Sequence, residues 1–154
     1  MSPVEQKLLE SKLEKALDDA WSKVNIALDK TSKPSANFAM EIWLAAEALE
    51  YSSLLFNLTY GLEDLKPAVR PRKDEAALIL IKESMDLLKR AREGRQRSAT
   101  DAYVNLRTAA DYLKTAHLDQ VKKFTKKTRE RLTRGFVPAK SPRRVSACFA
   151  RSLV

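Results

Sequence analysis

The stretch that decides the fold is residues 38–60, FAMEIWLAAEALEYSSLLFNLTY, which would carry apolar side chains on nearly every side of a helix. A helix that is apolar all round must be enclosed, either by other helices or by lipid. Three carboxylates, Glu41, Glu47 and Glu50, interrupt the run. Its uncharged part, residues 51–62, is too short for a hydrocarbon core about 30 Å thick. The stretch therefore predicts a central helix that neighbouring helices wrap.

Three further helices are predicted, over residues 4–29, from Asp74 to just before Gly94, and from Ser98 to just before Gly135. Each has apolar residues at steps of mostly three or four, and the chain has only three glycines and six prolines to interrupt them. No run alternates as a half-buried strand would. We expect an all-α fold, an antiparallel four-helix bundle with a long fourth helix and a basic C-terminal tail.

The predicted helix ends carry the residue types that helix ends require. Ser2 followed by Pro3 suits the start of the first helix. Gly61 suits the left-handed residue that ends the central helix. Ser98 suits the N-cap of the fourth helix, three residues before Asp101.

The charge of the chain is unevenly distributed. Residues 121–154 contain eleven Lys or Arg and one acid, Glu130, for a net charge of +10, whereas the whole chain is +9. Residues 1–120 therefore sum to −1. We predict two parts, a helical bundle over 1–120 and a basic helical extension with a flexible tail over 121–154. Such asymmetry indicates a polyanionic partner.

The residue inventory disfavours an enzyme. His117 is the single histidine and falls on the apolar stripe of the fourth helix, where a core or boundary role is expected. The single cysteine, Cys148, excludes an internal disulfide and is compatible with a reducing compartment. No zinc ligand set, histidine-based nucleophile or glycine-rich phosphate loop is present. We expect no catalytic residue, no metal and no cofactor.

The predicted phosphate contacts lie in three basic segments. Lysine and arginine supply the sequence-independent part of nucleic-acid affinity because they release counterions from the phosphates. If consecutive helices alternate in direction, the 61–73 connection and the basic end of the fourth helix share one end of the bundle and form a composite patch. The predicted contact residues are Lys122, Lys123, Lys126, Lys127, Arg129, Arg131 and Arg134 of the helix, Lys140, Arg143 and Arg144 of the tail, and Arg70, Arg72 and Lys73 of the connection.

We therefore expect a non-enzymatic, sequence-nonspecific nucleic-acid-binding protein, either a nucleoprotein or a subunit of a larger assembly, whose bundle serves self-association or docking. The alternative is a protein-interaction module that docks an acidic partner through the same amphipathic helix. Membrane binding is disfavoured because the non-basic face of that helix has only three bulky apolar residues, Val121, Phe124 and Leu132. The absence of an apolar leader segment favours the cytoplasm and is compatible with the nucleus or a virion.

Overall fold

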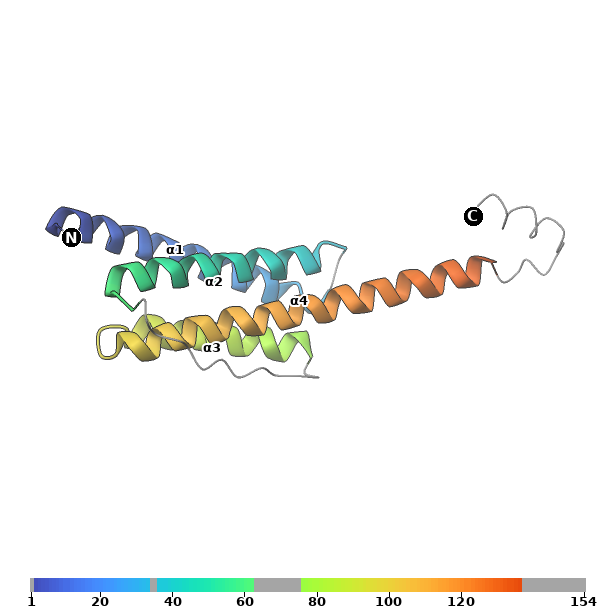
Figure 1. Ribbon diagram of the computed structural model, residues 1–154. Coiled ribbons are helices and arrows are strands. Elements are labelled where there is room, and N and C mark those ends of the chain that lie inside the picture. Colours follow the sequence, from blue (N-terminus) through green and yellow to red (C-terminus); the bar gives the residue numbers. More distant parts are fainter. Residues whose placement is uncertain (1, 34–35, 63–75, 137–154) are drawn as a thin grey trace. The chain divides into compact units, whose positions relative to one another are not determined.

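A computed structural model describes residues 2–33, 36–62 and 76–136 of the chain, and the side chains of residues 134–136 fall outside that description. The chain forms four α-helices in the order α1 (Pro3–Asp29), α2 (Phe38–Tyr60), α3 (Ala77–Gly94) and α4 (Ala99–Phe136) (Figure 1). It divides into two units, Met1–Gln120 and Val121–Val154, and α4 contributes residues to both. The predicted all-α, four-helix architecture is confirmed, as is the long fourth helix.

Local interactions fix the helix ends. The Ser2 hydroxyl accepts a hydrogen bond from the Glu5 amide, and the Glu5 carboxylate accepts one from the Ser2 amide, which completes a capping box at the start of α1. Gly61 ends α2 in the left-handed region at φ 66°. The Ser98 hydroxyl accepts from the Asp101 amide at 3.2 Å at the start of α4. These three ends are as predicted. The predicted first residues of α3, Asp74 and Glu75, lie outside the described residues.

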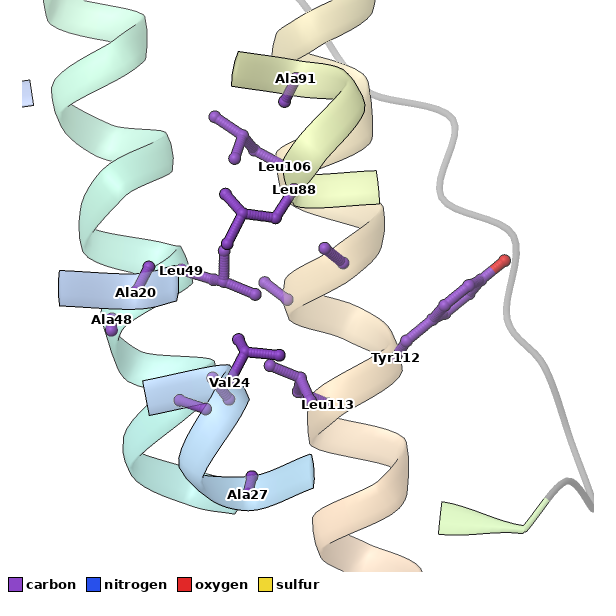
Figure 2. Packing of buried hydrophobic residues seen from close by; sticks show 14 of the residues in the cluster. Ala20, Val24, Ala27, Ala48, Leu49, Leu88, Ala91, Leu106, Tyr112 and Leu113 are labelled. Atoms are coloured by element: carbon purple, nitrogen blue, oxygen red, sulfur yellow. The ribbon is translucent and has the colours of Figure 1, made fainter. Parts of the chain in front are cut away.

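The core of the first unit is built from leucines that interdigitate between alanines. Figure 2 shows Leu49 of α2 and Leu88 of α3 meeting Leu106 and Leu113 of α4 at its centre, and all four are fully buried. Twelve alanines are also buried on the helix faces that pack together. Alanine allows helix axes to approach closely, so the core has the density that a stable bundle needs.

The direction of α2 follows from two contacts with α1. The Gln6 side-chain amide, in the first turn of α1, donates to the carbonyl of Thr59 in the last turn of α2 at 3.1 Å. At the other end, the Lys30 ammonium lies 2.6 Å from the Glu41 carboxylate. The two helices therefore run in opposite directions.

The direction of α3 differs from the prediction. Arg92 pairs with Asp18 at 2.5 Å and Arg95 pairs with Glu14, so α3 also runs opposite to α1. Helices α2 and α3, although consecutive, therefore run in the same direction, and the expectation of alternating directions is wrong. The physical reason is the length of the connection, since a chain of more than a dozen residues can join opposite ends of a bundle whereas a short loop cannot.

Helix α4 packs in the direction opposite to α2 and α3. The Ser84 hydroxyl of α3 donates to the Ala109 carbonyl at 3.1 Å, and Phe56 of α2 stacks on Tyr103 with ring centroids 6.5 Å apart. A second contact to α2 joins His117 Nδ1 to the Ala39 carbonyl at 3.0 Å. Every helix pair that these contacts define within the first unit is antiparallel, even though the order along the chain does not alternate.

The prediction that neighbours wrap the central helix is wrong for one of its faces. Helix α2 buries eleven residues, among them Phe38, Ile42 and Phe56. Its remaining face is exposed and carries large apolar side chains, namely Met40, Trp43, Leu44, Tyr51, Leu54 and Leu58. Contacts with α1 and α4 account for the buried face only. No helix is placed over the exposed face by the described residues.

Candidate nucleic-acid interface

The candidate site is the segment 121–133 of α4, in which every side chain is exposed. At 100° per residue the cations fall on one side of the helix, over an arc of about 200°, and the apolar residues fall on the other. Six of the predicted contact residues lie here, namely Lys122, Lys123, Lys126, Lys127, Arg129 and Arg131. Against them stands one carboxylate, Glu130, so the segment carries six positive charges and one negative, a net charge of +5.

The cations of the first unit are arranged differently, because carboxylates on adjacent helices neutralise many of them. Arg92 and Arg95 of α3 each reach a carboxylate of α1, and Lys114 of α4 reaches Glu50 of α2. These pairs join helices to one another. In segment 121–133 a single carboxylate cannot neutralise six cations, so positive charge accumulates at the surface of this segment.

The apolar side of segment 121–133 forms a shallow depression. It is lined by Phe124, Thr125, Thr128, Arg129 and Leu132. The Phe124 side chain is 62% exposed, so its ring is accessible for stacking against a planar group. The depression borders the cations directly, since Arg129 belongs to both faces.

The remaining predicted contact residues are not described by the structure. Arg134 lies in the helical part of α4, but its side chain falls outside the description. The tail residues Lys140, Arg143 and Arg144 and the connection residues Arg70, Arg72 and Lys73 lie outside the described residues. The reasoning for a composite patch is corrected, because it required α2 and α3 to alternate in direction. Leu62 instead leaves α2 at the end of the first unit where α3 ends and α4 begins.

The single histidine has a structural environment. His117 is half-buried, and because a carbonyl can only accept, Nδ1 carries the proton that it donates to Ala39. This contact ties α4 to the first turn of α2. In the described part of the chain no three side chains of His, Cys, Asp or Glu lie close enough together to hold a metal ion.

Sequence reasoning did not identify a polar cleft in the first unit. The cleft has a volume of about 370 Å³ and lies where the start of α1 meets the ends of α2 and α3; it is lined by Lys7, Glu10, Ser11, Leu13, Glu14, Tyr60, Arg95 and Gln96. Burial, together with the charge of Glu10, raises the pKa of the Tyr60 hydroxyl above its ordinary value of 10.0. Two cations and two carboxylates balance in this cleft, so it offers no net charge to attract a phosphate. Only the contacts between helix ends could have indicated it.

The described helices contain no segment that is both long and apolar enough to cross a membrane. Comparison with protein-family models, with curated protein sequences and with solved structures found no match for this chain. Its function is therefore argued from its own residues.

Proposed function

We propose that the chain is a non-enzymatic nucleic-acid-binding protein that contacts phosphates through segment 121–133 without reading sequence. The observation that carries the proposal is the exposure of six cations on one helical face with a single carboxylate among them. Each cation that neutralises a phosphate releases condensed counterions, and this entropy gain drives binding. Six such contacts suffice for the micromolar affinity that is typical of nonspecific binding.

The residue types favour phosphate contact over base readout. Four of the six cations are lysines, which act as point charges on flexible stems, and the two arginines are separated by Glu130. No Asn or Gln lies in segment 121–133 to pair with adenine, so base discrimination has little support. The exposed Phe124 ring supports a stacking contribution with unpaired bases.

The first test is whether the purified full chain carries nucleic acid. We expect a high ratio of absorbance at the nucleic-acid maximum to that at the protein maximum before nuclease treatment, and a normal ratio after it. Deleting residues 121–154 should abolish most polynucleotide affinity and leave residues 1–120 helical. Affinity that survives this deletion unchanged would place the phosphate contacts elsewhere.

A second candidate function, docking of an acidic protein partner, is supported by the exposed apolar depression beside the cations. An amphipathic helix that binds a groove uses its apolar side for affinity and its charges for orientation. Leu132→Ser separates the two functions. It removes part of the apolar side and leaves every cation in place. Nucleic-acid binding should then keep its affinity and salt dependence, whereas docking into a groove should weaken.

A further inference from the structure

The exposed face of α2 is unlike any other described surface of the first unit. Seven of its residues are exposed, and six of them are large and apolar, with exposed fractions from 38% for Leu44 to 57% for Met40 and Leu54. Glu47 is the one charged residue among the seven. On α3, by contrast, five of the seven exposed residues are charged. A helix with this composition requires cover on the exposed face as well.

The size of the face is that of an interface. Summed over the six apolar residues, the exposed fractions amount to about three complete side chains. At roughly 200 Å² for a large side chain this gives about 600 Å². The largest apolar patch of an ordinary monomer is about 300–600 Å², so this face is at or above the top of that range.

The spacing of the face indicates that a helix covers it. Exposed residues follow one another at alternating steps of four and three, at positions 40, 44, 47, 51, 54 and 58. This is the 3.5-residue period of a coiled-coil seam, in which one helix packs along another at a shallow angle. Trp43 lies beside the seam and widens it. Neither segment of the chain outside the description fits as the cover, because residues 63–75 contain two prolines and only twelve residues follow Pro142.

The seam complements itself when it is turned end for end. Reversing the helix about position 49 sets Met40 against Leu58, Leu44 against Leu54, and Glu47 against Tyr51. The carboxylate would then accept a hydrogen bond from the hydroxyl of the second copy, once on each side of the two-fold axis. A parallel arrangement would bring the two Glu47 carboxylates together instead, and like charges that lose water repel strongly.

We propose that two copies of this chain associate through α2, as an antiparallel and two-fold symmetric pair of helices. The two faces together would bury about 1,200 Å², which is at the lower end of the range for a stable interface. This proposal does not depend on nucleic-acid binding, since none of the residues involved belongs to segment 121–133.

The test is sedimentation equilibrium of the full chain, treated with nuclease and kept in high salt so that no polynucleotide bridges the copies. We expect a dimer in the micromolar range. Leu54→Lys should raise the dimer dissociation constant by about 100-fold or more, because an ammonium without a partner is then buried against Leu44. The matched control, Ile79→Lys, changes an apolar residue of α3 that is 46% exposed and should leave the dimer intact.

A wild-type chain that stays monomeric throughout the micromolar range would overturn the proposal, and so would a dimer that survives Leu54→Lys. Binding of the monomer to anionic vesicles through Leu54 would also overturn it and identify lipid as the cover.

A second measurement covers the case in which Leu54→Lys fails to fold. In a Cys148→Ala background, protein carrying Glu47→Cys is mixed with protein carrying Tyr51→Cys and oxidised. The antiparallel pair predicts disulfide formation that is faster in the mixture than in either protein alone. Faster crosslinking within each protein alone would contradict the antiparallel arrangement, and no crosslinking in any sample would contradict the interface.

Discussion

Neutralising one column of segment 121–133 should weaken nucleic-acid binding by an amount that the structure sets. Lys122, Lys126 and Arg129 recur at steps of four and three along one side of α4, and all three side chains are exposed. Changing them together to glutamine keeps the helix propensity nearly constant, so the helix should persist. The change removes three of the six described cations of the site.

The magnitude follows from counterion release. Each phosphate contact contributes about 0.9 to the log–log salt slope for duplex DNA and about 0.7 for a single strand. Losing three contacts should therefore reduce the slope by about 2.7 or about 2.1, respectively. Near 0.1 M salt the same three contacts account for a loss of affinity of roughly 500-fold on duplex DNA.

The assay is fluorescence anisotropy with labelled oligonucleotides, titrated at several salt concentrations. A matched control changes three exposed lysines of the first unit, Lys12, Lys15 and Lys89, to glutamine. Both variants lower the net charge by three, from +9 to +6, so they differ only in where the charge is removed. Circular dichroism checks that both remain helical. Equal changes of slope in the two variants, or an unchanged slope in the first variant, would refute the assignment of the contacts to this segment.

Three further predictions concern the first unit, each measured by urea denaturation. Because burial raises the pKa of Tyr60 above 10.0, the folded state holds this proton more tightly than the unfolded state. The free energy of unfolding should therefore fall as the pH rises from about 10 through the raised pKa, and Tyr60→Phe should flatten that part of the pH dependence; an identical profile in the variant would contradict the shift. Gly61→Ala should destabilise by about 1–2 kcal/mol, because the site has a φ of 66° while nothing lies within 4 Å of an added Cβ. Gly94→Ala, at a helical site that is equally open, should stabilise by about 0.5–1 kcal/mol, and the same sign for both would count against the left-handed cap. Leu49→Ala should cost about 2–5 kcal/mol because it empties part of the core, whereas Ile79→Ala at an exposed site should change stability by well under 1 kcal/mol; comparable losses would contradict the placement of Leu49.

The helix ends could be predicted because they depend on neighbours in sequence. Ser2 and Glu5 cap each other across three residues, and Gly61 supplies a backbone conformation that other residues adopt at a cost. The cations of segment 121–133 could be predicted for the same reason, since the helical period alone places them on one face.

The direction of α3 could not be predicted, because the connection between Leu62 and Ala76 is long enough to allow either direction. Only contacts between residues distant in sequence, such as Arg95 with Glu14, determine it. The composite patch depended on that direction, so the error in one carried over to the other.

The exposed face of α2 also could not be predicted. The apolar pattern showed that this helix needs cover on every side, and this requirement is unchanged. Sequence does not reveal how many of the covering helices belong to the same chain. The first unit supplies contacts for one side of α2, where Phe56 and Leu49 are buried, and leaves Leu54 exposed.

The central claim is that the cations of segment 121–133 contact a polyanion directly. Acetylation footprinting of the full chain, with and without bound polynucleotide, tests this most directly because it reports each lysine separately. The account predicts that Lys122, Lys126 and Lys127 become protected while Lys12 and Lys15 react as before. Protection confined to lysines of residues 1–120, or no protection at saturating polynucleotide, would contradict it.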